Sequence, residues 1–412
     1  MMKRVSSLLI ILSLILVACN NKPATSEKSS NTEVLDSLFV AAIAHHEIPA
    51  AAVYLSYQGK EIYNKAFGWK NIEENQELQV SDIFRIASMT KSVTAVATLQ
   101  LVEKGLLKLD DPVSKYISEF KDPVVLIEVL PDSSFTSRPA VGEITIQHLL
   151  THTSGIGYGF QSDKYNALVI KNGITEGFEE RPIGLQENTR RIARLPLFHD
   201  PGDDWTYSLS FDVLGAVIEV VSSESLDTYY YNHIFLPLGM NDTYFYLPED
   251  KAERLVTVYE HAPNRDDFIL TTYPLTQYPV QGAKTYLSGG ADLSSTTKDL
   301  AIFAQMLLNK GSYNGKRVLG EKYVDMMTSK QSEHGWWDSE IGFGPSITTK
   351  AGAVVKPQAE NSFEFGGFYD TFCWVDPSNE LVAILLLQMY PNNEFDVHYK
   401  FRTLAYKCLE DY

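Results

Sequence analysis

The sequence predicts a mixed α/β protein in which both ends of the chain build one α/β part and a mostly helical part is inserted between them. Strand-like patterns occur near the two ends, at 51–67 and 372–388. From 113 to 285 the pattern is mostly helical and is broken by long loops. We therefore expect a first α/β part at 34–112, a helical lobe at 113–285 and a second α/β part at 286–412.

Residues 1–19 have the pattern of a processing segment. A basic pair precedes an apolar stretch at 8–17 that is too short to span a bilayer. The stretch ends in Leu-Val-Ala-Cys, which resembles a bacterial lipobox in which Cys19 is lipidated and becomes the new N-terminus. The alternative is an ordinary secretory signal with a chance cysteine. Residues 20–33 have almost nothing to bury and predict a flexible tether, so we expect an exported lipoprotein anchored to a membrane through Cys19.

Composition bounds the remaining function classes. The apolar content of 44% is that of a core-forming globular protein, and the net charge of −17 is spread along the chain without a basic patch. Nucleic acid is therefore not an expected partner. Cys373 and Cys408 both occur in apolar patterns and are expected to be buried, and nothing in their spacing requires a disulfide. The chain has no phosphate-binding loop, dinucleotide fingerprint or Gly-x-Ser-x-Gly motif, so we expect no cofactor.

The sequence predicts four elements in the first α/β part. An amphipathic helix is expected at 34–46, and two strands at 51–56 and 61–67 are joined by a Gln-Gly turn that is typical of a hairpin. The segment 88–104 is apolar nearly all round, which predicts a central, buried helix. Gly105 is a plausible C-terminal cap for that helix.

The helical lobe and the second α/β part contain the remaining elements. Helices are expected at 145–152 (capped by Thr145), 185–195, 211–221, 226–235, 297–310 and 393–409. Apolar strands are expected at 372–376 and 380–388, on either side of a Pro-Ser-Asn turn.

The start of the buried helix carries the strongest chemical signal. Ser88 and Lys91 are three residues apart, so one helical turn places the lysine ammonium beside the serine hydroxyl. The helix N-terminus directs unpaired N–H groups and a positive dipole end at the same place. This combination suits an activated serine nucleophile.

Ser-x-x-Lys also occurs at Ser118 and at Ser295. Ser118 lies in a polar linker, and Ser295 precedes a helix with a polar face, which indicates a surface helix cap. Only Ser88 opens a buried helix, where a lysine is costly unless it has a partner or a task. The alternative for Ser88 is an ordinary helix cap with Lys91 extending to solvent, and the local sequence leaves both interpretations open.

Several ordered motifs then indicate a family. The chain from about residue 35 to its C-terminus resembles the serine hydrolases related to class C β-lactamases, penicillin-binding DD-peptidases and their esterase relatives. The matching segments are Ser-Met-Thr-Lys at 88–91, 109–113, 149–155, 201–202 with 207–208, 235–240, 288–291, 366–367 and 374–377. The resemblance implies an antiparallel sheet flanked by helices, an inserted helical lobe, and a site in the cleft between them.

The resemblance implies a second catalytic element at Tyr207. The family carries a Tyr-x-Asn motif, and the matching residues here are Tyr-Ser-Leu at 207–209. A nearby cation such as Lys91 favours the phenolate form of a tyrosine, which makes it a useful base. The alternative is a buried core tyrosine in a chain with 23 tyrosines. Leu209 replaces the asparagine that would bind a substrate amide, which puts amide substrates in doubt.

The third element of the family is Lys-Thr-Gly or a variant of it, and Phe365, Gly366 and Gly367 stand at its position. Phe365 removes a cation that would hold a substrate carboxylate, whereas the two glycines permit close approach of a substrate. By resemblance, the backbone N–H groups of Ser88 and Phe368 form the oxyanion hole.

Two further groups of residues have competing interpretations. His148 and His152 have a spacing that would suit a metal, but no third ligand follows nearby, and the His-Thr-Ser-Gly turn of the family explains His152 as structural. We therefore expect no metal. Tyr158, Trp336 and their aromatic neighbours fall in loops, where they either line an apolar substrate pocket or pack between the two parts.

Taken together, these features predict a serine hydrolase in which Ser88 attacks an ester-like carbonyl while Lys91 and Tyr207 handle its proton. An esterase on small or apolar esters is favoured because Leu209 and Phe365 replace polar groups that bind amides and carboxylates. A β-lactamase, a DD-peptidase or an acyltransferase is the alternative among enzymes. A catalytically idle lipoprotein that binds cell-wall fragments in its cleft is the alternative of another class.

Overall fold

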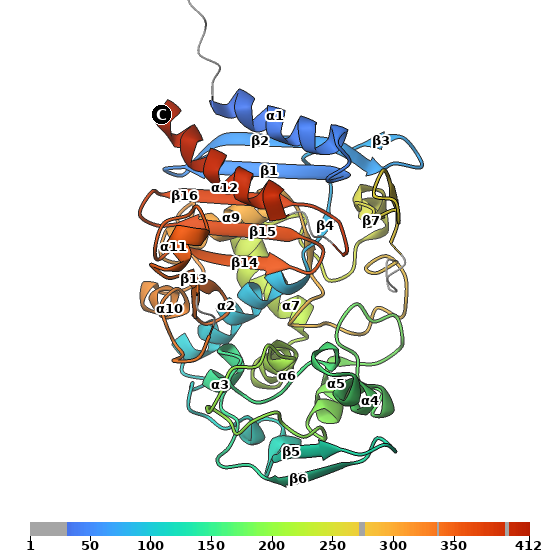
Figure 1. The fold of residues 1–412 in the computed structure, drawn as a ribbon. Helices are drawn as coiled ribbons and strands as arrows, with labels where there is room; N and C mark the ends of the chain where they lie inside the picture. Colours follow the sequence, from blue (N-terminus) through green and yellow to red (C-terminus); the bar gives the residue numbers. More distant parts are fainter. Residues whose placement is uncertain (1–30, 272–276, 336–337, 392–394) are drawn as a thin grey trace, which may run out of the picture.

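The computed structural model describes residues 31–271, 277–335, 338–391 and 395–412. Its main sheet contains β1 (Ala50–Tyr57), β2 (Lys60–Asn71), β3 (Gln76–Glu77), β12 (Ser339–Ile341), β13 (Ser346–Thr348), β14 (Phe363–Gly367), β15 (Thr371–Asp376) and β16 (Leu381–Leu386). All neighbours pair antiparallel, in the order β12-β13-β14-β15-β16-β1-β2-β3 (Figure 1). Because β1 pairs with β16, segments from both ends of the chain meet at the middle of the sheet. The predicted antiparallel sheet with flanking helices is confirmed.

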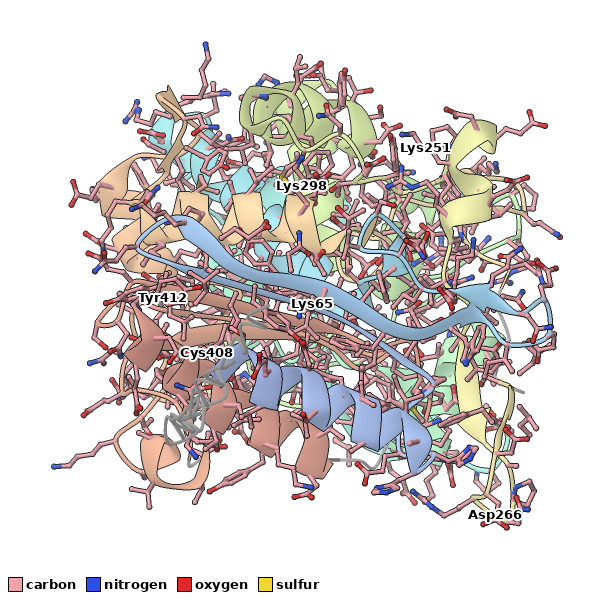
Figure 2. The ribbon with its side chains drawn as sticks, turned by 90° about the horizontal axis from the view of Figure 1, so that it is seen from above. Lys65, Lys251, Asp266, Lys298, Cys408 and Tyr412 are labelled. Atoms are coloured by element: carbon pink, nitrogen blue, oxygen red, sulfur yellow. The ribbon has the colours of Figure 1, made fainter. Side chains whose placement is uncertain are left out.

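One face of the sheet is covered by α1 (Asn31–Ala44) and α12 (Phe395–Cys408), which lie side by side (Figure 2). Phe39 of α1 and Phe401 of α12 contact each other with ring centroids 5.9 Å apart. Trp374 of β15 lies edge-on to Phe401 and is fully buried. Both terminal helices therefore pack an apolar face against the strands.

The opposite face carries α9 (Thr297–Leu308) and, beyond it, α2 (Thr90–Glu103) (Figure 2). Every residue of α2 from Thr90 to Leu101 is buried, as predicted for a helix that is apolar nearly all round. The helix begins just after a 3-10 turn, η1 (Ala87–Met89), which contains Ser88. Gly105 follows its C-terminal end with φ of +69°, in the left-handed conformation that suits a cap.

The lobe is built around α6 (Ser210–Ser222), which contacts α2 and its helical neighbours. Those neighbours are α3 (Ile146–Leu150), α5 (Leu185–Ile192) and α7 (Leu226–Tyr230), and α4 (Asp163–Lys171) lies further out. Thr145 caps α3, because its side chain accepts a hydrogen bond from the backbone of His148, as predicted.

The lobe also contains a hairpin that the sequence pattern did not predict. Its strands are β5 (Val124–Val129) and β6 (Phe135–Pro139). The register shifts between Leu126 and Glu128, so the apolar residues of β5 do not alternate regularly. Only Val125 and Val129 of β5 are buried. An exposed, bulged hairpin leaves little period-two signal in the sequence.

Shorter elements complete the described chain. They are β4 (Phe84–Arg85), η2 (Val113–Lys115), η3 (Ser118–Phe120), η4 (Gly159–Gln161), η5 (Tyr231–Phe235), α8 (Leu236–Leu238), η6 (Glu249–Arg254), β7 (Tyr259–His261), β8 (Phe268–Leu270), β9 (Ser294–Ser295), β10 (Ser312–Tyr313), β11 (Lys316–Arg317), α10 (Glu321–Met327), α11 (Gly352–Val355) and η7 (Leu409–Asp411). The expectation that Ser295 is a surface helix cap is wrong. Ser295 is fully buried in β9, and Thr296 caps α9 by accepting a hydrogen bond from the backbone of Asp299.

Both cysteines of the described chain are free and buried, which confirms the prediction that Cys373 and Cys408 are apolar core residues. Over the described ranges, no helix has the length and apolar character needed to cross a bilayer. The predicted signal segment, the greater part of the predicted tether, and Cys19 lie outside the described residues.

Candidate active site

Ser88 lies in η1, on the wall of a cavity of about 960 Å³. The residue before it, Ala87, has φ of +44°, although alanine rarely adopts the left-handed region. Strained backbone of this kind is found preferentially at functional sites. The strained turn and the buried start of α2 together hold the Ser88 hydroxyl at the edge of the cavity.

Lys91 is buried, with 3% of its surface exposed, and it points back along the helix toward Ser88. Its Nζ lies 3.2 Å from Ser88 Oγ, as the three-residue spacing predicts. Nζ also donates a 2.8 Å hydrogen bond to the carbonyl oxygen of Gly290 and contacts the hydroxyl of Tyr158 at 3.4 Å. The lysine is therefore turned inward, which excludes the alternative in which it extends to solvent.

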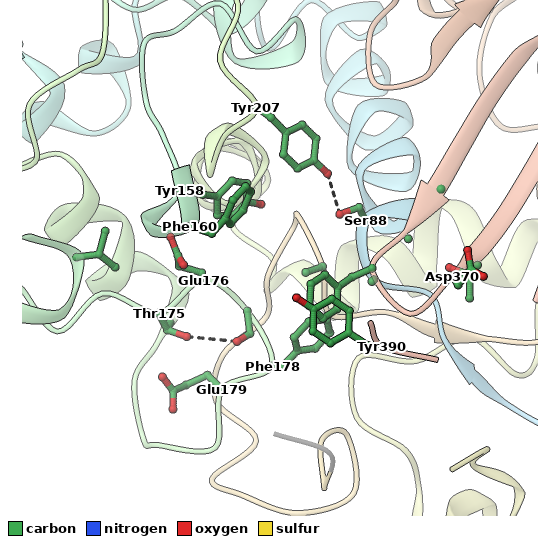
Figure 3. A pocket seen from close by; sticks show the side chains of 18 of the residues that line it. Ser88, Tyr158, Phe160, Thr175, Glu176, Phe178, Glu179, Tyr207, Asp370 and Tyr390 are labelled. Atoms are coloured by element: carbon green, nitrogen blue, oxygen red, sulfur yellow. Dashed lines mark hydrogen bonds between the residues drawn. The ribbon is translucent and has the colours of Figure 1, made fainter. Parts of the chain in front are cut away.

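Tyr207 comes from the loop before α6, and its hydroxyl donates a 2.8 Å hydrogen bond to Ser88 Oγ. Figure 3 shows the two hydroxyl groups directed toward each other across the cavity wall. The Nζ atom of Lys91 lies 4.7 Å from the centroid of the Tyr207 ring. The structure thus brings Ser88 and Lys91 together with Tyr207, which lies 119 residues after Ser88 in the sequence.

The ring of His152 packs against the ring of Tyr207. The two ring centroids are 4.7 Å apart, and His152 Nδ1 shares a 2.9 Å hydrogen bond with the hydroxyl of Ser208. Complete burial, and to a lesser degree the charge of Lys91, hold the pKa of His152 well below its usual value. His148, by contrast, accepts a hydrogen bond from the backbone of Thr145 at the start of α3. Both histidines have these local partners, and the described residues include no group of three metal-ligating side chains placed to hold an ion.

Asp212 is a buried acid beside the site that sequence reasoning missed. It lies on α6 and accepts a 2.8 Å hydrogen bond from the hydroxyl of Tyr286. Burial raises its pKa, and the positive charge of Lys91 acts in the opposite direction. A Cβ atom on Gly290 would lie 2.7 Å from Asp212 Oδ2 and 3.6 Å from Lys91 Nζ, so Gly290 is in contact with both. The sequence feature that could have indicated Asp212 is an acidic residue near the start of a mostly apolar helical stretch.

The predicted glycine pair lies at the end of β14, which contacts the η1 turn that contains Ser88. Gly366, Gly367 and Phe368 all line the cavity. A Cβ atom on Gly367 would lie 2.3 Å from the carbonyl oxygen of Ile86 and 2.3 Å from the hydroxyl of Thr371. Glycine is therefore required for β14 to approach the turn that holds Ser88.

Two residues predicted to bind substrate do not line the cavity. Leu209 is fully buried at the start of α6, where it belongs to the hydrophobic core. Phe365 is also buried, and its ring meets Phe303 of α9 edge-on. The prediction that Leu209 and Phe365 contact the substrate is therefore corrected, because both side chains pack into the core. Trp336 lies outside the described residues.

The aromatic wall of the cavity comes from Tyr158 and Phe160, whose rings stack with centroids 5.0 Å apart. Tyr158 also stacks against Tyr207 at 5.6 Å. Phe160 is 71% exposed, and Phe368 is 38% exposed, so the mouth of the cavity has an apolar rim. The side chain of Phe368 stacks on Tyr390 at 3.9 Å.

The polar part of the cavity lining was not predicted from the sequence. It comprises Glu176, Glu179, Arg181, Asp370 and His398, together with Asn166 and Thr175. These residues come from α4 and loops of the lobe, from the β14–β15 turn and from α12, and no short motif connects them. Their proximity depends on the complete fold.

A serine in contact with a buried lysine and a tyrosine, inside a cleft beside an antiparallel sheet, defines a serine hydrolase of the acyl-enzyme type. The chain belongs to the Beta-lactamase family, whose model matches residues 35–407.

Comparison with known proteins agrees with this assignment. Esterase EstB of Burkholderia gladioli is 31% identical over 369 residues, which cover 85% of this chain and 89% of EstB. Monacolin J acid methylbutanoyltransferase of Aspergillus terreus is 29% identical, over 88% of this chain and 91% of its own length. Among solved structures, EstCE1, described as a hydrolase with promiscuous acyltransferase activity, matches with a TM-score of 0.78 and 24% identity, over 91% of this chain and 98% of that structure.

Proposed function

We propose that this serine hydrolase is an esterase that cleaves esters with a bulky apolar part through an acyl-enzyme on Ser88. The observation that carries this proposal is the pair of contacts to Ser88 Oγ, at 2.8 Å from the Tyr207 hydroxyl and 3.2 Å from Lys91 Nζ. Both neighbours are proton-carrying groups within transfer distance of the nucleophile.

In the proposed reaction, Ser88 Oγ attacks the ester carbonyl carbon and its proton passes to the Tyr207–Lys91 pair. The tetrahedral intermediate then expels the alcohol, which takes that proton back from the pair. Water attacks the acyl-enzyme by the same route in reverse, releasing the carboxylic acid and restoring the Ser88 hydroxyl. Lys91 is held for this role by its hydrogen bond to Gly290.

The oxyanion of the intermediate is expected to be bound by the backbone N–H groups of Ser88 and Phe368, as the family resemblance implies. The close approach of Gly367 to Ile86 supports this arrangement, because it brings the end of β14 next to η1. Both Ser88 and Phe368 line the same cavity.

Esters fit the cavity better than β-lactams or peptide C-termini do. The position at which the family carries a cation for a substrate carboxylate is occupied here by Phe365, which is packed into the core. The mouth of the cavity carries exposed Phe160, Ile170 and Phe368. An apolar rim and a cavity of about 960 Å³ suit a bulky, largely apolar substrate body.

An acyltransferase is the second candidate, in which an alcohol other than water accepts the acyl group. It is supported by the similarity to the methylbutanoyltransferase of Aspergillus terreus, over 88% of this chain. The same acyl-enzyme would serve both reactions, and the acceptor alone would differ.

Acylation of the purified protein tests the proposal. A fluorophosphonate probe should label the wild-type protein and leave Ser88→Ala unlabelled, and short-chain para-nitrophenyl esters should be hydrolysed by the wild type only. Equal labelling of both proteins, or none, would favour the idle binding protein instead. Faster turnover of a chromogenic cephalosporin than of any ester would assign the protein to the β-lactamases.

We also propose that Cys19 carries a lipid that anchors the exported protein to a membrane, on the basis of the Leu-Val-Ala-Cys sequence at 16–19. The Cys19→Ser variant should then move from the membrane fraction to the soluble fraction. Retention of the variant in the membrane fraction would exclude this anchor.

A further inference from the structure

Three carboxylates line the cavity, and two of them have basic partners. Glu179 receives two hydrogen bonds from Arg181 Nε, at 3.0 and 2.9 Å, and a further one from its Nη2. Asp370 pairs with His398 Nε2 at 2.8 Å. These two acids are therefore engaged by side chains of the protein itself.

Glu176 differs from both of them. Its Oε1 accepts a 2.5 Å hydrogen bond from the backbone N–H of Gly159. Over the described residues, no lysine, arginine or histidine forms an ion pair or hydrogen bond with Glu176. Its second oxygen, Oε2, is therefore an acceptor without a basic partner on the wall of a ligand-sized cavity.

The surroundings of Glu176 are largely apolar. Gly159 lies in the sequence between Tyr158 and Phe160, whose rings stack on each other, and Figure 3 shows Glu176 next to these rings. The apolar residues Val169 and Ile174 line the same cavity as Glu176. Burial raises the pKa of Glu176, in keeping with a carboxyl group in a poorly solvated wall. Such a group is costly to the protein unless a hydrogen-bond donor meets it.

We propose that Glu176 is a specificity-determining residue, which accepts a hydrogen bond from a hydroxyl or ammonium group on the apolar part of the substrate. The preferred substrate is then a bulky apolar ester that carries one donor at a distance from the ester bond. This inference rests on the proposed esterase function and narrows it. Arg181 and His398 do not offer the same selectivity, because their carboxylate partners already occupy them.

Glu176 also has a purely structural role to be separated from recognition, because it holds the loop at Gly159. The Glu176→Gln variant separates the two. The glutamine keeps a carbonyl oxygen for the Gly159 N–H and replaces the second carboxylate oxygen with an NH₂ group of the same size. The loop contact is retained, and the acceptor offered to the substrate becomes a donor.

The test compares para-nitrophenyl esters of ω-hydroxy and ω-amino fatty acids with methyl-terminated esters of equal length, over a series of chain lengths. At the best length, the wild type should prefer a donor-bearing ester by about 10-fold in kcat/KM, the equivalent of one hydrogen bond to a charged group. Glu176→Gln should abolish this preference. The matched control, Glu179→Gln, removes a charge from a carboxylate that already has a partner and should change both esters by the same factor.

If the wild type hydrolyses donor-bearing and methyl-terminated esters with equal kcat/KM at every chain length, the inference is overturned. An unchanged kcat/KM ratio in Glu176→Gln would overturn it as well. Binding of the same esters to Ser88→Ala protein, measured by calorimetry, provides a readout that does not depend on hydrolysis. Tighter binding of the donor-bearing ester that disappears in the Ser88→Ala, Glu176→Gln double variant supports the inference even if the wild type hydrolyses neither ester. Equal binding of both esters contradicts it.

Discussion

Lys91 is fixed by the backbone of Gly290, whose carbonyl oxygen accepts a 2.8 Å hydrogen bond from Lys91 Nζ. The two residues are 199 positions apart, so the contact joins the start of α2 to the segment before β9. The same Nζ faces Ser88 Oγ, and the backbone contact therefore aims the lysine at the nucleophile.

Gly290→Ala should reduce kcat by about 10- to 100-fold, because displacement of a catalytic group by an ångström has effects of this size. The new Cβ would lie 2.7 Å from Asp212 Oδ2, and Asp212 or Lys91 would have to move. The measurement is hydrolysis of a para-nitrophenyl ester together with the melting temperature. Gly184→Ala is the control, because its Cβ would meet no atom within 4 Å. An unchanged kcat in Gly290→Ala would contradict the proposed alignment.

Tyr207→Phe removes the hydroxyl that lies 2.8 Å from Ser88 Oγ while keeping the ring that packs on His152. Loss of a general acid–base group typically lowers turnover by about 10²- to 10⁴-fold, so kcat should fall within this range while the melting temperature stays close to that of the wild type. Tyr231→Phe, at a residue that is 54% exposed, should have no effect on either quantity. Turnover that survives in Tyr207→Phe would remove this tyrosine from the mechanism.

Because His152 is buried, we expect the free energy of unfolding to fall as the pH drops below neutrality. Burial and the Lys91 charge keep its pKa well below the usual value in the folded state, whereas in the unfolded chain it binds a proton below about pH 6.5. The unfolded state then holds more protons, so the free energy of unfolding falls as the pH decreases, by at most about 1.4 kcal/mol per pH unit for one group. Above the unfolded pKa this contribution is complete and constant.

Urea denaturation at a series of pH values from 7.5 downward measures this slope. His152→Asn tolerates the left-handed backbone at this position, where φ is +58°, and should make the slope shallower. A variant that follows the same slope as the wild type would show that His152 does not contribute to it.

Glu364 of β14, whose side chain is 12% exposed, lies between Arg402 of α12 and Lys356, at 2.9 and 2.8 Å. Burial alone would raise its pKa, but the two cations bring it below the ordinary value. Glu364→Gln leaves Arg402 without its carboxylate partner and leaves Lys356 with Asp338 alone, at 3.2 Å. The free energy of unfolding should therefore fall by about 3 kcal/mol. Glu333→Gln breaks a surface pair with Lys330 and should change stability by less than about 1 kcal/mol. Equal effects of the two substitutions in urea denaturation would contradict this explanation.

The contact between Ser88 and Lys91 could be predicted from the sequence because it is local. A three-residue spacing at the start of an apolar helix leaves few other arrangements. The place of Tyr207 followed from the order of motifs along the chain rather than from geometry. Strands and helices near both ends of the chain were predicted from strong apolar period-two and helical patterns, whereas their assembly into an antiparallel sheet with flanking helices was implied by the family resemblance.

Contacts that depend on the complete fold could not be predicted in this way. Asp212 and Gly290 meet Lys91 only after α6 and the segment before β9 have packed on α2. Phe365 illustrates the opposite error. Its place in a family motif suggested a cavity residue, but the alternation of β14 turns its side chain into the core, while Gly366 remains at the cavity.

The pairing of β1 with β16 also has a consequence for how the protein is made. Tyr57 and Leu381 are partners in this pair, so the middle of the sheet joins residues that are synthesised at opposite ends of translation. Until β16 has emerged, β1 retains an unpaired edge, which is the kind of surface that invites aggregation. Contacts of such long range also slow folding. The nascent chain therefore carries its nucleophile long before it has a complete sheet on which to hold it, and chaperone protection of this edge would matter most during that interval.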